Sequence, residues 1–183
     1  TITVDAAGTL TATDVNSSAT DDDTSDISLT TTAGDIAVMS ITAGSNNDVT
    51  LTAAGAITED GQASTLVAAD ALTAIASGAI ALDTTVDNLT ASSSTNGAIK
   101  IDETDAVTLK SVTTDNGGIT VTAGGMMTAT LIGSNTNHDD NDISLTTTAG
   151  DIAVGSITAG ADGDVTLGAA GAITGGQTDA VEV

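Results

Sequence analysis

Short segments in which apolar and polar residues alternate recur along the whole chain. Their starting residues, which lie 20 to 27 positions apart, are Ile2, Ile27, Val49, Leu72, Ile99, Ile119, Ile143 and Val165. Alternation with a period of two predicts a β-strand that buries one face and exposes the other. Gly, Asn and Asp follow these segments, and these residues tolerate the backbone conformations of sharp turns. Each step therefore predicts a strand, a small-residue corner, a second short strand and a polar loop.

A longer repeat contains these short steps. The sequence DISLTTTAGDIAV occurs at 26–38 and again at 142–154, and the match extends over 33 residues with five differences. With single-residue slips, residues 2–58 (the first copy) match residues 119–174 (the second copy), which gives a unit of 116–117 residues. Five short steps fill one such unit. Repeats of about 20–50 residues are typical of solenoids, propellers and arrays.

Stacked coils account best for the short steps. A strand of three to five residues cannot bury its apolar side chains alone, but it can pair in parallel with the same strand of the next coil, about 4.8 Å away. The sequence therefore predicts an all-β fold, a parallel β-solenoid of about eight coils with 20–27 residues each. We expect one continuous segment over residues 1–183, about 38 Å long. Residues 63–80 have the Ala and Leu content of a helix, but their flanking Gly and their place in the repeat favour strands.

Two other repeat architectures fit the sequence less well. Propeller blades need about 40 residues each and usually carry aromatic residues. An array of immunoglobulin-like sandwiches would have about 100 residues per unit, near the length of the long repeat, and normally a core Trp or Tyr. The short period and the lack of Phe, Tyr and Trp in this chain disfavour both architectures.

The composition supports a folded chain with a thin aliphatic core, and it restricts the partners. Hydrophobic residues make up 40% of the chain although its formal net charge is −23, whereas a disordered chain of that charge would contain few of them. Lys100 and Lys110 are the only Lys or Arg residues. The charge argues against nucleic acid and anionic membrane surfaces as partners, and it favours cations. The sequence contains no apolar run of the length expected for membrane insertion.

Several phrases of the chain resemble one family of repeats. GDIAVMSITAG, DVTLTAAGAITEDG, NLTASSSTNGAIKIDETDAVTL and GGITVTAGG are similar to the repeats of large secreted bacterial adhesins of the filamentous haemagglutinin type. The likeness extends over nearly the whole chain, and the motif defines a class of repeat. It implies a right-handed parallel β-helix in an extracellular fibre or adhesin stalk at the cell surface, with cell-surface or matrix glycans as partners. The amino-terminal secretion domain typical of that family is not part of this sequence.

Both ends of the sequence have the pattern of a strand without a polar cap. Residues 1–4 read TITV and residues 180–183 read AVEV. A final coil without a cap leaves unpaired strand edges, which other strands can join. We therefore expect either continuation within a longer repetitive protein or end-to-end association of several molecules of this chain.

Acidic residues concentrate in loops at matching places of the two copies. The candidate calcium ligands are Asp21, Asp22, Asp23, Asp26, Asp139, Asp140, Asp142, Asp162 and Asp164. Carboxylates and Asn carbonyls are the hard oxygen ligands that Ca²⁺ prefers, although neither an EF-hand loop nor the nonapeptide calcium repeat is present. Solvated acidic loops are the simpler interpretation, and Ca²⁺ is the one cofactor that the sequence suggests.

Catalysis and ice binding have weak signals. Carbohydrate-active solenoid enzymes usually use basic and aromatic residues, and this chain has no Arg and no aromatic residue. Lys100 and Lys110 fall in one coil, near Asp102, Glu103 and Asp105, and we interpret this group as a local surface ion pair. Thr50 and Thr52 place two hydroxyls on one strand face, as in ice-binding solenoids, but the unequal steps argue against a regular face. We therefore expect a non-catalytic structural segment, and the alternatives are a calcium-binding adhesive module, an ice-binding solenoid and a carbohydrate-active enzyme.

Overall fold

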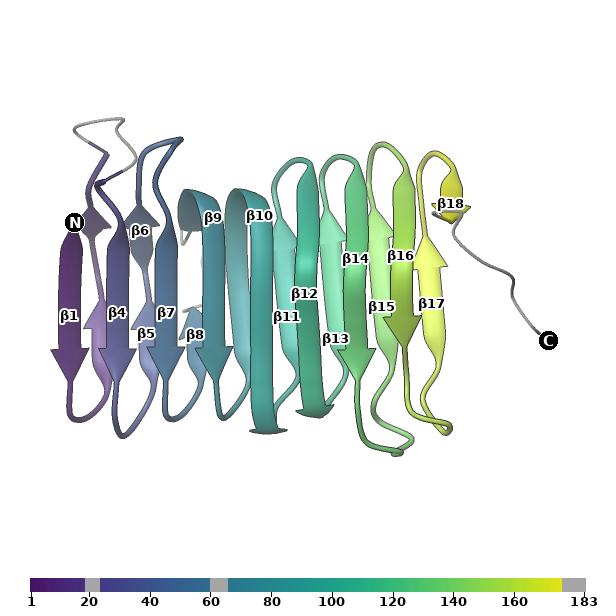
Figure 1. Cartoon of the computed structure of the whole chain (residues 1–183), viewed down its shortest axis with the longest axis horizontal. Helices are drawn as coiled ribbons and strands as arrows, with labels where there is room; N and C mark the ends of the chain where they lie inside the picture. Colours follow the sequence, from purple (N-terminus) through teal and green to yellow (C-terminus); the bar gives the residue numbers. More distant parts are fainter. Residues whose placement is uncertain (19–23, 60–65, 176–183) are drawn as a thin grey trace.

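The computed structural model describes residues 1–18, 24–59 and 66–175. Over these residues the chain contains strands and no helix, and it winds into a parallel β-solenoid of about seven turns (Figure 1). The predicted all-β solenoid is confirmed, and the expected number of about eight coils is close to the observed winding. Leu66–Ala76 form a strand and Ile80 begins the next one after a bend, so this segment is not a helix; residues 63–65 lie outside the described residues. Right-handed winding stays a prediction from the resemblance.

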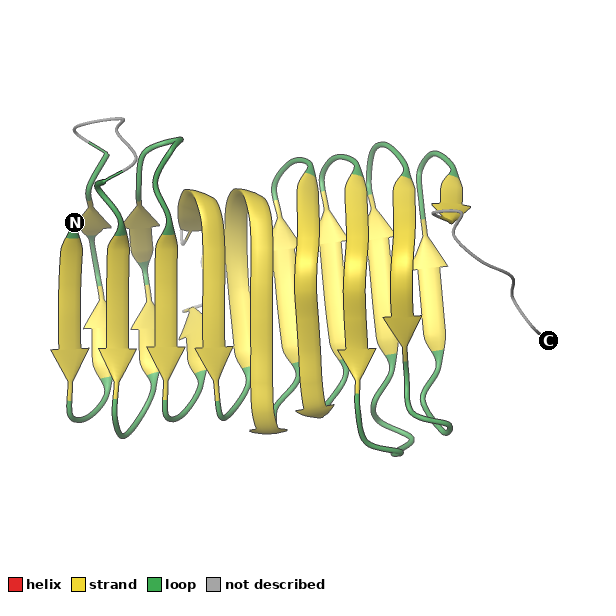
Figure 2. Cartoon of the chain, viewed as in Figure 1, coloured by secondary structure: helices red, strands yellow, loops and turns green. Residues whose placement is uncertain are grey.

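Most strands are short, and the longest ones bend around corners of the coil without leaving the sheet (Figure 2). The two long strands, β9 and β10, contain 11 and 17 residues. The strands are β1 (Ile2–Ala6), β2 (Leu10–Ala12), β3 (Val15–Asn16), β4 (Ile27–Thr31), β5 (Ile36–Val38), β6 (Ser40–Thr42), β7 (Val49–Ala53), β8 (Ile57–Glu59), β9 (Leu66–Ala76), β10 (Ile80–Asn96), β11 (Ile99–Glu103), β12 (Val107–Asn116), β13 (Ile119–Ala123), β14 (Met127–Ser134), β15 (Ile143–Thr147), β16 (Ile152–Thr158), β17 (Val165–Gly168) and β18 (Ile173–Gly175).

Each coil has three strand positions, which we call the first, second and third faces. On the first face β1, β4, β7 and β9 pair in order, and the ladder continues through parts of β10, β12, β14 and β16. The second face contains β2, β5, β8, β10, β11, β13, β15 and β17. The third face begins with β3, β6 and β9, reaches β10, and continues after a shift through β12, β14, β16 and β18. Three parallel ladders therefore join each coil to the next.

Aliphatic side chains in register fill the interior of the coils. The inward ladder of the second face consists of Leu10, Ile36, Ile57, Ile80, Ile99, Ile119, Ile143 and Val165. The six central members are completely buried. Each such side chain contributes about 1.5–3 kcal/mol when it is removed from water. Because all of them are similar in size, successive coils can keep the same outline.

A Thr–Gly pair shapes three of the corners. Thr31 Oγ1 donates a hydrogen bond to the carbonyl of Gly34 at 2.9 Å, and Thr147 Oγ1 donates to that of Gly150 at 3.0 Å. Thr114 makes the same contact, at 2.6 Å, with the carbonyl oxygen three residues further on. The glycines at these corners have positive φ, for example 102° and 91° at the first two, which L side chains rarely adopt. The inward Thr hydroxyl thus finds an acceptor at the corner, and the same Gly carbonyls also accept a hydrogen bond from the next coil.

The register differs from the sequence prediction in the middle of the chain. Leu72 pairs with Leu89, and not with Ile99, whose partner in the preceding coil is Ile80. The expected step of 27 residues from Leu72 was therefore wrong. The cause is a coil of only 17 residues, in which β9 and β10 turn corners without a loop.

The short coil rotates the second copy by one face relative to the first. The strand ISLTT lies on the first face as β4 and on the second face as β15. The long repeat thus corresponds to five turns plus one face, and not to five whole steps. As a result, the loop between β6 and β7 and the loop between β16 and β17 lie on opposite edges of the solenoid, at the upper left and the lower right of Figure 1.

Candidate functional site

The acidic loops connect consecutive coils. Asp26 Oδ1 accepts a hydrogen bond from the backbone amide of Asp48 at 3.1 Å, and Asp142 Oδ1 accepts one from the amide of Asp164 at 2.8 Å. Donor and acceptor are 22 residues apart in both copies, which is one coil. A carboxylate that accepts an amide hydrogen bond is a strong acceptor, so these acids stabilise the stacking of loops.

The remaining predicted calcium ligands are dispersed. Asp162 exchanges two hydrogen bonds with Asn137, at 2.7 and 2.9 Å. Asp139 and Asp140 are exposed, and the Asp140 carboxylate lies 3.6 Å from His138 Nδ1. The predicted ligands Asp21, Asp22 and Asp23 lie outside the described residues.

No metal site is visible in the part of the chain that the structure describes. Within it, no three Asp, Glu, His or Cys side chains gather in a group that could hold a metal ion. The matching loops of the two copies lie on different edges of the solenoid, so they do not combine into one site (Figure 1). Calcium binding stays a prediction. The hydrogen bonds of Asp26, Asp142 and Asp162 with neighbouring coils favour a structural role for these acids.

Two further acids have the same structural role and were not singled out from the sequence. Asp35 Oδ1 accepts the amide of Ala56 at 2.7 Å, and Asp151 Oδ1 accepts the amide of Ala172 at 2.7 Å. Both follow Ala-Gly at a corner, and each partner lies 21 residues further along the chain. The sequence does contain a signal for this contact: the motif AGD occurs at 33–35 and 149–151, one coil before another small-residue corner.

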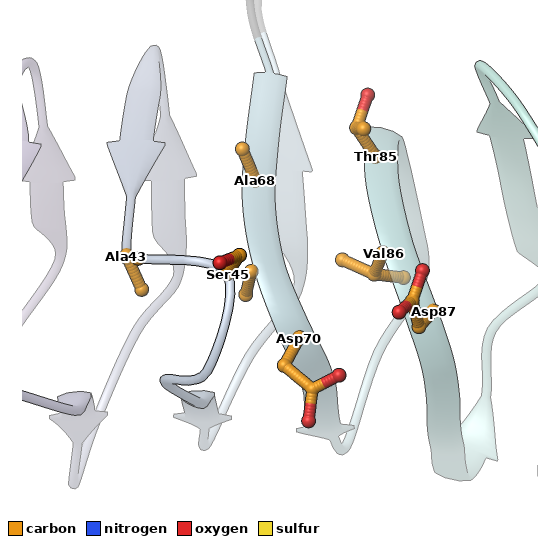
Figure 3. Close-up of a pocket in the computed structure, with 9 residues that line it drawn as sticks. Ala43, Ser45, Ala68, Asp70, Thr85, Val86 and Asp87 are labelled. Carbon is orange, nitrogen blue, oxygen red and sulfur yellow. The ribbon is translucent and has the colours of Figure 1, made fainter. Parts of the chain in front are cut away.

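A hollow of about 270 Å³ lies where the outline of the coil changes (Figure 3). It forms beside the loop 43–48 because β9 and β10 turn the same corner without a loop. It is lined by Ala43, Gly44, Ser45, Ala68, Ala69, Asp70, Thr85, Val86 and Asp87. A neighbouring hollow of about 210 Å³ shares Asp87 with it. The floor is mainly small and apolar, and the two carboxylates belong to adjacent coils.

The predicted surface ion pair is present on the second face. The Lys100 ammonium binds the Asp102 carboxylate, and this hydrogen bond raises the pKa of Lys100. Nearby, burial raises the pKa of Glu59, and the charge of Asp83 raises it further. The Glu59 Oε2 atom is buried and has no hydrogen-bond partner among the described residues.

Glu103 was expected at the surface and is instead buried, with 4% of its surface exposed. Its Oε2 accepts a hydrogen bond from Thr84 Oγ1 at 2.7 Å and one from the amide of Val86 at 3.1 Å. Its Oε1 accepts from the amide of Asp105 at 3.3 Å. The sequence contained the signal, because Glu103 follows the inward residues Ile99 and Ile101 at the same spacing of two.

Outward hydroxyls form a regular row on the first face. Its members, paired in register from coil to coil, are Thr3, Ser28, Thr50, Thr73 and Thr90. The coils differ in length, but the extra residues lie in the loops, so the row stays in register. The parallel row two residues further on contains Asp5 and Ile75, which interrupt it.

The comparisons with known proteins add no relative. No protein-family model, no curated protein and no solved structure matches the chain. The described residues also contain no helix with the length and apolar character needed to cross a membrane. The residues themselves are therefore the basis for any functional conclusion.

The contact between Asp142 and the next coil leads to a prediction about stability. Asp142→Ala should lower the free energy of unfolding by about 1–2 kcal/mol, because it removes the acceptor for the Asp164 amide. Asp142→Asn keeps an oxygen acceptor and should cost less. Urea unfolding measures both, and Asp139→Ala, which removes the same charge from an exposed side chain of the same loop, is the control. Equal effects of Asp142→Ala and Asp139→Ala would show that the contact is not stabilising.

Proposed function

We propose that this chain is a non-catalytic structural segment of an extracellular bacterial surface fibre or adhesin stalk. The observation that carries the proposal is the set of three parallel ladders that join coil to coil. Each coil advances the chain by about 4.8 Å along the axis, so such a segment spans distance as a rod. The resemblance to filamentous haemagglutinin-type repeats supports the fibre and its location at the cell surface.

Structural roles of the acidic side chains support the non-catalytic part of the proposal. Asp26, Asp35, Asp142 and Asp151 accept amide hydrogen bonds from the following coil. Paired carboxylates at an active site would instead converge on a substrate. In this chain the four acids instead each bond an amide that lies one coil further on.

Charge and exposed edges favour association through the ends of the rod. The net charge of −23 makes the sides of neighbouring molecules repel one another. Inward side chains are less protected in the first and last described coils, where Ile2 and Val4 are half-buried and Val165 and Ile173 are 46% and 49% exposed. Further coils of the same pattern would cover these side chains, whether they come from a longer chain or from another molecule.

Resistance to trypsin tests the rod. The only two cleavage sites, Lys100 and Lys110, lie in the strands β11 and β12. Cleavage requires local unfolding of the strand, so the folded chain should stay intact while the urea-unfolded chain is cut at both sites. Gel electrophoresis with mass spectrometry measures the products. Cleavage of the folded chain as fast as of the unfolded chain would contradict the ladder at these coils.

Sedimentation velocity at increasing protein concentration tests end-to-end association. We expect elongated species whose mass grows with concentration, equally in buffer with a calcium chelator and in buffer with CaCl₂. Val165→Glu places a charge at the exposed end of the ladder and should reduce this growth. Thr120→Glu, which adds the same charge to the exposed side of a central strand, is the control.

The two buffers distinguish the alternatives. Growth in CaCl₂ alone would favour the calcium-binding adhesive module over simple stacking. A monomer at all concentrations in both buffers would contradict association through the ends, while leaving the rod itself to be judged from its frictional ratio. A frictional ratio typical of a compact sphere would contradict the rod.

A further inference from the structure

Glu103 lies at the junction where the third face of the solenoid shifts. Thr84 ends the second-face part of β10 and pairs with Glu103 in the next coil. After Glu103 the chain turns, and the third face resumes only at Val107, which pairs onward with Met127. At this junction the amide of Val86 is bonded to the Glu103 carboxylate, at 3.1 and 3.3 Å, in place of a backbone carbonyl of the next coil. A side chain therefore completes the ladder here.

The carboxylate is enclosed on several sides. The Thr84 hydroxyl and the amides of Val86 and Asp105 donate to it, and Thr84 is completely buried. The Thr104 amide bonds the Thr84 carbonyl at 2.9 Å, which brings the two coils together beside the carboxylate. Neither of the two ion pairs found among the described residues involves Glu103.

The charged residues around this junction are mostly acidic. Asp83 and Asp87 flank the bonded segment of β10, and Asp102 and Asp105 flank Glu103 on its own coil. The nearby cation on β11, Lys100, is exposed and paired with Asp102. These four Asp residues are partly or fully exposed, so they are not buried with Glu103. An ionised Glu103 would be buried without a cationic partner, and its hydrogen-bond donors offset only part of the cost of burial.

We propose that Glu103 makes the contact between β10 and β11 a proton-controlled joint. Burial favours the protonated side chain in the closed joint, and ionisation favours an open joint in which water reaches the carboxylate. The inference does not depend on the proposed function, because it concerns one buried carboxyl group and its donors. Opening would also change the hollow on the outer side of the joint, since Thr85, Val86 and Asp87 line it.

The direction of the pH dependence follows from burial. Burial raises the pKa of Glu103 from 4.5 to about 7. Between these values the folded state keeps a proton that the unfolded state has lost, so the stability of the fold decreases as the pH rises from about 4.5 to about 7. Above that range the loss is complete. The difference corresponds to a factor of about 300 in the equilibrium between closed and open forms.

Amide hydrogen exchange, corrected for the intrinsic effect of pH on the exchange rate, tests the joint. In the wild-type chain the opening equilibrium at Val86 should rise by up to about 300-fold between pH 5 and pH 8. In Glu103→Gln, which keeps the shape and an oxygen acceptor, this rise should disappear. Glu59→Gln is the matched control, because Glu59 also has a raised pKa but interacts with Asp83, whereas the Val86 amide donates to Glu103, so the rise should persist.

A pH-dependent opening at Val86 that is equal in the wild type and in Glu103→Gln would overturn the proposal. Should Glu103→Gln fail to fold, carbon NMR of the Glu103 carboxyl in the wild-type chain gives a second test. A titration midpoint near 7 supports the joint, whereas a midpoint at or below 5 overturns it.

Discussion

The hydrogen bonds between consecutive parallel coils are the constraint on which the other features of this chain depend. Their spacing of about 4.8 Å leaves no room for a coil whose strands fall out of register. Insertions are therefore confined to the corners, where loops such as 43–48 and 159–164 project outward. The strands inside vary little in outline, while coil length along the chain varies widely. A chain with this constraint can change its surface without changing its core.

The same ladders decide what each residue type does. Inward positions carry Ile, Val, Leu and Ala, and the last inward position of a strand often carries Thr, as at Thr31 and Thr147, to bond the corner that follows. Asp after a corner Gly bonds the amide one coil further on, as Asp35 does with Ala56. Glu103 is the exception on the inner side, where its carboxylate accepts the Val86 amide in place of a backbone carbonyl. The high acidic content is thus partly a set of contacts between coils.

Much of this fold could be predicted from the sequence. The alternation at Ile27, Ser28 and Leu29 indicated strands, and the repeat indicated stacking; both were correct. The register from Leu72 to Ile99 was wrong, because a sequence repeat does not show when a coil loses its loop and turns within one strand. The rotation of the second copy follows from that single short coil. It places the matching loops of the two copies on opposite edges of the rod (Figure 1).

The candidate sites were harder to predict than the fold, for a physical reason. Loop composition shows that oxygen ligands are present, but whether Asp142 faces a metal or the amide of Asp164 depends on the position of the next coil. Glu103 is different, since its spacing from Ile101 already places it on the buried side of β11. There the alternation of the strand carried more information than the charge of the residue. Acidic side chains at inward positions therefore merit separate examination in repeat sequences.

Cysteine cross-linking tests the central claim most directly, because the chain contains no native cysteine. Thr73 and Thr90 face each other across the first face in adjacent coils. Their Cα separation of about 4.8 Å is suitable for a disulfide. The account predicts rapid oxidation of the Thr73→Cys, Thr90→Cys double variant and none for Thr73→Cys, Lys100→Cys, the pair that an uninterrupted repeat would align. The reverse result would contradict the coil register and, with it, the rotation of the two copies.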